Sequence, residues 1–171
     1  MRHKKPNGFS LIELLIVVAI ILIIAAIAIP NLLRSKIAAN ESSAVASVRT
    51  ISTAETTYAS SWGSGYAAIL DNLGGPAPCA VATAAAACLI DPLLSVAPFT
   101  KSGYVFASAG NTLAGGTFNG FEANATPSVT QVTGVRAFCA DQTGMIRFNT
   151  TGVAIGTGAG TCATAALLVG N

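Results

Sequence analysis

Charged residues are scarce in this 171-residue chain. Asp, Glu, Lys and Arg make up 9% of the residues, whereas about a quarter is usual for a soluble domain. Histidine occurs once, as His3, so the sequence offers no imidazole cluster for a transition metal and no base that could activate its serines or threonines. We therefore expect no catalytic residue, no metal site and no cofactor.

A basic patch is absent too. The formal net charge is +2, and Arg2, Lys4 and Lys5 all precede residue 9. Without the first eight residues, six basic and seven acidic side chains remain (9 − 3 against 7). No basic cluster carries interleaved aromatic residues, which argues against nucleic-acid binding. A nearly neutral surface instead favours self-association.

An apolar run follows the basic leader. Residues 9–29 read FSLIELLIVVAIILIIAAIAI, which is long enough to cross a bilayer as a helix. The basic flank predicts a cytoplasmic N-terminus, with the rest of the chain across the membrane. Pro30 ends the run and is expected to kink the helix rather than end it.

The helical pattern continues over residues 31–62. An apolar stripe with spacings of three, four or seven residues comprises Leu33, Ile37, Ala44, Val48, Ile51 and Tyr58. The charged residues are expected mostly on other faces of this helix: Arg34, Lys36, Glu41, Arg49 and Glu55. Gly63, Ser64 and Gly65 then predict its end.

A globular domain is expected over residues 63–171. Residues 66–101 are rich in Gly and Pro, and within them 81–89 could form one or two helical turns. Four β-type runs follow, at residues 104–107, 117–124, 135–140 and 145–148. A turn over 141–144 joins the last two; Asp141 is a turn residue there in preference to a calcium ligand, and Gly144 is expected at positive φ.

These patterns predict an α+β fold. A long N-terminal helix has a membrane-spanning half and an amphipathic half, and the amphipathic half packs on a small antiparallel sheet of about four strands. The tail after residue 150 is rich in Gly, Ala and Thr and shows no clear pattern.

The leader boundary carries a specific motif. Residues 4–15 read KKPNGFSLIELL, a short basic leader that ends in Gly8, then Phe9, then Glu13 inside an apolar helix. This segment resembles the class III signal of type IV pilins and their pseudopilin relatives. The specific resemblance covers residues 1–30, and the order of helix and sheet with late cysteines extends it loosely over the chain.

The resemblance implies a processing route. A membrane-embedded prepilin peptidase would cut between Gly8 and Phe9 and methylate the new amine of Phe9. The chain then divides into a leader (1–8), a filament-core helix (9–30), an amphipathic half (31–62) and the globular domain (63–171). The precursor would lie in the bacterial inner membrane until an ATPase-driven machine assembles copies of it into an extracellular pilus (fimbrium), or a periplasmic filament if it is a pseudopilin.

Glu13 is costly where it stands. A carboxylate in a spanning helix costs about 2.5–3.5 kcal/mol on insertion scales, so it needs a partner or a function. The natural opposite charge is the amine of Phe9, in the same chain or in a packed neighbour. We therefore expect Glu13 to act in assembly.

The four cysteines all follow the apolar run. An even count in an exported domain predicts two disulfides, whereas four free thiols would indicate a cytosolic protein. Of the three possible connectivities we favour neighbour pairing, Cys79 with Cys88 and Cys139 with Cys162. The first closes a Pro/Ala-rich loop, and the second ties the tail to a strand, as late cysteines do in many pilins.

Other interpretations of the N-terminus exist. In a secretory signal peptide, Ala26-Ile27-Ala28 would be the cleavage site, but Glu13 and the helical pattern beyond Pro30 disagree with it. A plain signal anchor explains neither Gly8-Phe9 nor Glu13. Among filament proteins, the alternatives to a pilin are a type II secretion pseudopilin and an adhesin-like minor subunit.

Overall fold

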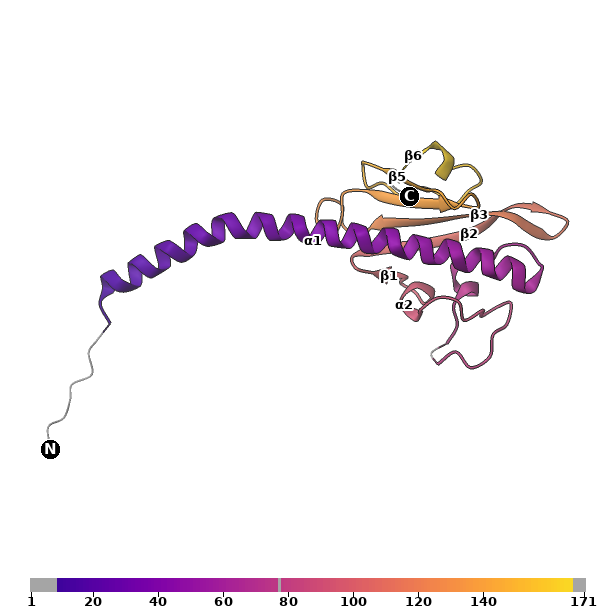
Figure 1. Cartoon of the computed structure of the whole chain (residues 1–171), viewed down its shortest axis with the longest axis horizontal. Coiled ribbons are helices and arrows are strands. Elements are labelled where there is room, and N and C mark those ends of the chain that lie inside the picture. The colour runs from indigo at the N-terminus through magenta and orange to yellow at the C-terminus, as the bar shows by residue number, and fades with distance from the viewer. Residues whose placement is uncertain (1–8, 77, 168–171) are drawn as a thin grey trace, which may run out of the picture. The chain divides into compact units, whose positions relative to one another are not determined.

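The computed structural model describes residues 9–76 and 78–167, which fall into two compact units, Met1–Lys36 and Ile37–Asn171. Helix α1 (Leu11–Trp62) runs through both units, and every other element belongs to the second (Figure 1). The leader, including Gly8 and His3, lies outside the described residues.

The predicted long helix is confirmed. It has 52 residues and keeps Pro30 in its interior. It ends at Trp62 because Gly63 and Gly65 adopt φ values of 63° and 79°, in the left-handed region that glycine enters without steric cost. The N–H of Gly63 still bonds back to the carbonyl of Ala59 at 3.2 Å, which closes the last turn.

The second unit contains an antiparallel sheet whose six strands follow one another in chain order. They are β1 (Thr100–Lys101), β2 (Tyr104–Ala114), β3 (Thr117–Pro127), β4 (Ala137–Asp141), β5 (Ile146–Asn149) and β6 (Ala166–Leu167). The longest pair, β2 and β3, is joined by Gly115 and Gly116, both at positive φ as a tight hairpin turn requires.

The predicted α+β class is correct, and the strand count is corrected from about four to six. The two added strands, β1 and β6, have two residues each and are too short to show an alternating pattern. The run at 104–107 extends to Ala114 because the hairpin partner β3 supplies hydrogen bonds to its polar and small residues. The turn at 141–144 is confirmed, with Gly144 at φ 73°.

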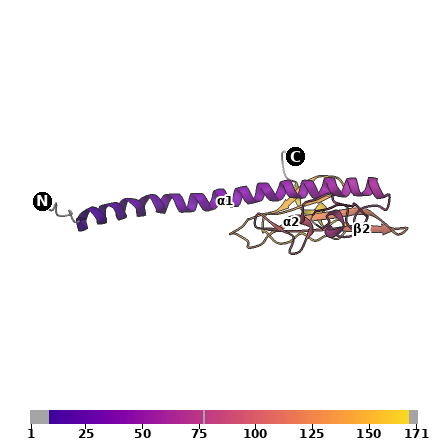
Figure 2. The same ribbon diagram turned by 90° about the horizontal axis from the view of Figure 1, so that it is seen from below.

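One face of the sheet packs on the helix. In the second unit, α1 forms one layer and the strands form the other (Figure 2). Ala44, Val48 and Ile51 of α1 are fully buried in one cluster with large side chains from the strands, among them Tyr104, Phe106, Phe121, Phe138 and Ile146. The predicted stripe of α1 is thus the core face from Ala44 onward, whereas Leu33 is 57% exposed.

The tail covers the other face. Strand β4 is buried along its whole length, because Phe138 and Ala140 face the helix while Ala137 and Cys139 contact Ile155 and Cys162. The amide of Asn124 on β3 also donates to the carbonyl of Ile155. A segment with no readable pattern in the sequence therefore forms the second cover of the sheet.

The connection between α1 and the sheet contains two short helices, η1 (Leu70–Leu73) and α2 (Pro92–Ser95). The prediction of helical turns over 81–89 is wrong, because residues 81–89 form no helix. The main chain there bonds to the end of η1 instead, for example from Ala87 N–H to the Asn72 carbonyl and from Leu89 N–H to the Leu73 carbonyl, both at 2.8 Å.

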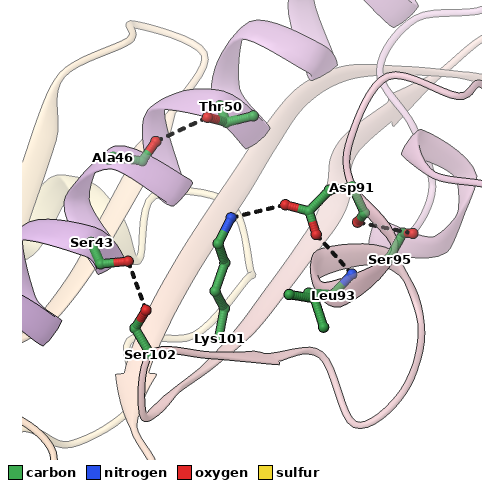
Figure 3. Close-up of polar contacts among 8 residues, drawn as sticks. All are labelled: Ser43, Ala46, Thr50, Asp91, Leu93, Ser95, Lys101 and Ser102. Carbon is green, nitrogen blue, oxygen red and sulfur yellow. Dashed lines mark hydrogen bonds and ion pairs between the residues drawn. The ribbon is translucent and has the colours of Figure 1, made fainter.

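Asp91 organises the end of this connection. Its carboxylate accepts the N–H of Leu93, which caps α2, and the Nζ of Lys101 on β1, each at 2.8 Å (Figure 3). The Ser43 hydroxyl of α1 reaches Ser102 at 2.9 Å in the same region. These contacts hold the last part of the connection beside the helix.

Candidate functional site

The N-terminal end of α1 carries the motif residues. Phe9 is 75% exposed and precedes the first helical residue, Leu11. Glu13 lies in the first turn, and its Oε2 accepts the main-chain N–H of Ser10 at 3.0 Å. This is one half of a capping box, in which a Glu three residues after a Ser satisfies the N–H that the helix leaves free.

The capping role of Glu13 was not predicted, although Ser10-Leu11-Ile12-Glu13 fits the S-x-x-E pattern that would have indicated it. A negative charge here is also favoured by the helix dipole. The carboxylate is therefore held at the residue that directly follows Phe9.

The apolar N-terminal part of α1, from Leu11 to Leu33, is not covered by the other described residues. Large side chains between Leu11 and Leu33 are 46–79% exposed. The helix contains a window of mean hydropathy 3.3, none of which is buried, and it is long and apolar enough to cross a membrane. So much exposed apolar surface requires a partner outside the chain, either lipid or other helices.

Pro30 lies inside the helix without ending it. The next turn is supported by side chains, because the Asn31 amide donates to the Ile27 carbonyl and the Ser35 hydroxyl to the Asn31 carbonyl, both at 3.0 Å. Back-bonding of this kind, from a side chain to the carbonyl four residues earlier, often bends a helix. The predicted kink at Pro30 stays a prediction.

Glu41 anchors α1 to the sheet. It was expected on a polar face, but it is only 7% exposed and lies on the core side of the helix. Its Oε1 accepts the main-chain N–H groups of Val135 and Arg136, at 2.9 and 3.0 Å. Burial alone would raise the pKa of Glu41, but hydrogen bonds from Arg136 and Val135 and the Arg136 charge hold it below its ordinary value.

Glu55 is the second correction, because it is fully buried and not on an outer face. It accepts the hydroxyl of Ser108 on β2 at 2.8 Å and the N–H of Ala67 at 2.9 Å. Burial raises the pKa of this carboxyl to about 7, and the two hydrogen bonds offset only part of that effect. Glu55 therefore joins α1, the segment after it and the sheet.

The helical spacing in the sequence indicates that both acids lie on the core face of α1. Positions 37, 41, 44, 48, 51, 55 and 58 follow one another at intervals of three or four, so Glu41 and Glu55 fill the two gaps in the predicted stripe. The prediction failed because it assigned charged residues to solvent by type. Both carboxylates have enough donors to be buried on the core face.

The predicted disulfide between Cys139 and Cys162 is confirmed, with an S–S distance of 2.00 Å and both residues fully buried. It fastens the tail to β4. Cys79 and Cys88 are also bonded in the structure, with a Cα–Cα distance of 5.8 Å, in the normal range for disulfides.

Asp141 serves the turn after β4, since its carboxylate accepts the N–H of Thr143 at 2.9 Å. Among the described residues, no three His, Cys, Asp or Glu side chains group as metal ligands would. A surface groove of about 470 Å³ beside the tail is lined by Phe148, Asn149, Thr150, Thr151, Ala154, Ile155, Gly156, Thr161, Thr164, Ala165 and Ala166. Its lining has hydroxyl and apolar groups but neither an acid nor a base.

The structure thus separates the predicted residues into two groups. Phe9 lies just before α1, Glu13 and Pro30 lie in its exposed part, and the four cysteines lie in the second unit. Gly8 lies outside the described residues. The exposed part of α1 is the candidate functional segment.

Comparisons with known proteins agree with that choice. Residues 3–29 match the family described as "Prokaryotic N-terminal methylation motif". The chain is 47% identical over 56 residues to the "Type IV major pilin protein PilA" of Myxococcus xanthus. It is 61% identical over 41 residues to the "Type IV wide pilus major component PilA4" of Thermus thermophilus.

The similarity is confined to part of each protein. The first match covers 33% of this chain and 26% of its relative, and the second covers 24% of this chain and 30% of its relative. No solved structure matches the chain. The chain carries the prokaryotic N-terminal methylation motif, and over part of its length it is similar to these two type IV pilins.

Proposed function

We propose that this protein is a structural subunit of a type IV pilus, and not an enzyme. One observation carries the proposal: from Leu11 onward, the segment that matches the methylation motif is an exposed apolar helix that no other described residue covers. Such a helix is stable in a bilayer before assembly and among identical helices afterwards. No feature of the described residues favours a pseudopilin over a pilin.

Processing prepares the helix. In this proposal, a prepilin peptidase cuts between Gly8 and Phe9 and the amine of Phe9 is methylated, which removes the basic leader. The precursor spans the bacterial inner membrane with its N-terminus in the cytoplasm, as the positions of Arg2, Lys4 and Lys5 suggest. The assembly machinery then moves it into an extracellular filament.

Glu13 gives the packed helices their axial register. Ile, Leu, Val and Ala repeat along residues 9–29 with little distinction, so apolar packing alone leaves neighbouring helices free to slip. We assign to Glu13 a pairing with the Phe9 amine of an adjoining subunit, because any slip then leaves two unpaired charges in an apolar seam. The capping bond from Ser10 already holds the carboxylate at the end of the helix where that amine forms.

Mass spectrometry of filaments sheared from the native cell tests this function. The expected subunit begins at a methylated Phe9, and electron microscopy of the same sample should show pili. A subunit that begins at Met1 or Ile29, or filaments that lack this chain, would contradict the proposal.

A further inference from the structure

The carboxylates of the second unit are almost all used inside it. Glu41, Glu55 and Asp91 bind the partners described above, and Asp141 caps its own turn. Glu122 on β3, only 1% exposed, accepts the N–H of Cys162 at 2.8 Å and the hydroxyl of Thr161. The carboxylates of these acids therefore already have donors within the subunit, although Asp91 itself is exposed.

Asp71 is the exception. It lies in η1, is exposed, and its carboxylate has neither a hydrogen bond nor an ion pair within residues 9–76 and 78–167. It is the one carboxylate in the described part of the second unit that is free to meet another molecule.

Two cations on α1, like Asp71, are exposed and have no ion-pair partner among the described residues. They are Arg34 and Lys36, whereas Arg136 and Lys101 are paired with Glu41 and Asp91. At 100° per residue, positions 34 and 36 point about 200° apart, to opposite sides of the helix. A neighbour on either side of the helix thus meets one of them.

Filament assembly changes the surroundings of these charges. Arg34 and Lys36 follow the apolar segment directly, so packing of that segment against other helices also removes water from them. A desolvated charge is costly unless an opposite charge meets it. Within one subunit Glu13 does not supply that charge, because it precedes Arg34 by 21 residues, about 32 Å along the helix, and between subunits Glu13 is assigned above to the Phe9 amine.

We propose that Asp71 of one subunit pairs with Arg34 or Lys36 of a neighbouring subunit in the filament. The contact rests on the proposed pilus function and adds an electrostatic interface to the apolar one. It joins η1 of one copy to α1 of the next. Such a pair fixes the register in which neighbouring copies pack, since like charges in contact are strongly disfavoured.

Charge reversal and rescue in cells with one gene copy provide the test. Asp71→Lys should lose most of the sheared filaments, while the processed subunit accumulates in the membrane. Ala82→Lys adds the same charge at another exposed position of the same connection, and its filament yield should stay close to that of the unaltered chain. The filament yield of Asp71→Asn should lie between those of Asp71→Lys and Ala82→Lys, because it removes the attraction without adding repulsion.

The rescue identifies the partner. Asp71→Lys combined with Arg34→Glu, or with Lys36→Glu, should restore filaments, whereas Asp71→Lys combined with Ser42→Glu, an added acid elsewhere on the exposed side of α1, should not. Proteolysis of the membrane-bound subunit checks that each variant is folded. Equal yields from Asp71→Lys and Ala82→Lys, or rescue by neither reversal, would overturn the pairing while the pilus function stands. Absence of the unaltered chain from any filament would instead overturn the function itself.

Discussion

Glu41 on α1 and Arg136, directly before β4, are 95 residues apart in the sequence and are joined by three hydrogen bonds. The carboxylate Oε2 accepts both Nε at 2.9 Å and Nη2 at 2.7 Å, and Oε1 accepts the main-chain N–H of Arg136 at 3.0 Å, so both oxygens of Glu41 are engaged by this one residue. The Arg136 guanidinium lies over the rings of Phe138 and Phe148, at 5.4 and 5.5 Å. The pair therefore fastens the helix to the sheet near the point where α1 enters the second unit.

Glu41→Gln should lower the free energy of unfolding by about 2 kcal/mol. The reason is that Arg136 loses its counter-charge, although its side chain is 39% exposed and water compensates in part. Urea unfolding of the full chain in detergent can be followed by the fluorescence of Trp62, the only tryptophan. Ser42→Ala, at the exposed neighbouring position, serves as the control. An equal midpoint for both variants would show that the pair does not anchor the helix.

Glu55 should make the second unit less stable as pH rises. Its pKa is about 7 in the folded chain and 4.5 as the ordinary value, so the folded state holds an extra proton between these values. That contribution is complete below about pH 4.5 and is lost as pH rises through 7. At about 1.4 kcal/mol for each pKa unit, the total change is about 3 kcal/mol.

Glu55→Gln tests the effect, because the amide is neutral at every pH. It keeps one oxygen for the Ala67 N–H, and its NH2 group can donate to the Ser108 hydroxyl oxygen. The difference in unfolding free energy between Glu55→Gln and the unaltered chain should grow from pH 5 to pH 8 in favour of the variant. Glu41, with its lowered pKa, works the other way and loses its contribution below about pH 4.5, so it does not mimic this trend. A difference that is constant with pH would disprove the assignment.

Replacement of Cys139 and Cys162 by serine should free the tail from the outer face of the sheet. The closed loop spans 23 residues, and its loss should lower stability by about 2–4 kcal/mol. Hydrogen exchange should rise in β4 and around Ile155, which the tail buries. The matched replacement of Cys79 and Cys88 by serine should lower stability by less, since Cys79 is exposed and no strand loses its cover there. The opposite ranking would contradict this role of the tail.

Glu13→Leu should enter the membrane at least as well as the unaltered chain, because it removes a costly charge. It should still be cut after Gly8, since the residues at the cut are intact. It should yield few or no filaments when it is the only copy in the cell. Ile16→Leu, an apolar exchange one turn further along, is the control and should assemble. Normal filament yield from Glu13→Leu would remove the role in register that we assign to this carboxylate.

The sequence alone determined the long helix, its end and the candidate functional segment. Residues 9–29 are almost wholly apolar, so they are stable only away from water, in lipid or among other helices. Gly8, Phe9 and Glu13 form a local motif that needs no tertiary contact to be recognised. The runs that became β3 and β5 can likewise be recognised as strands from their local sequence alone.

Tertiary structure decided which polar groups are buried and what covers the sheet. The helical period placed positions 41 and 55 on the core face, but only donors from Arg136, Ser108 and Ala67 make carboxylates acceptable there. The tail has no periodic pattern because Cys162, Ile155 and main-chain groups hold it on the sheet individually. Contacts between residues so far apart in the sequence leave no local signal, so only the folded chain shows them.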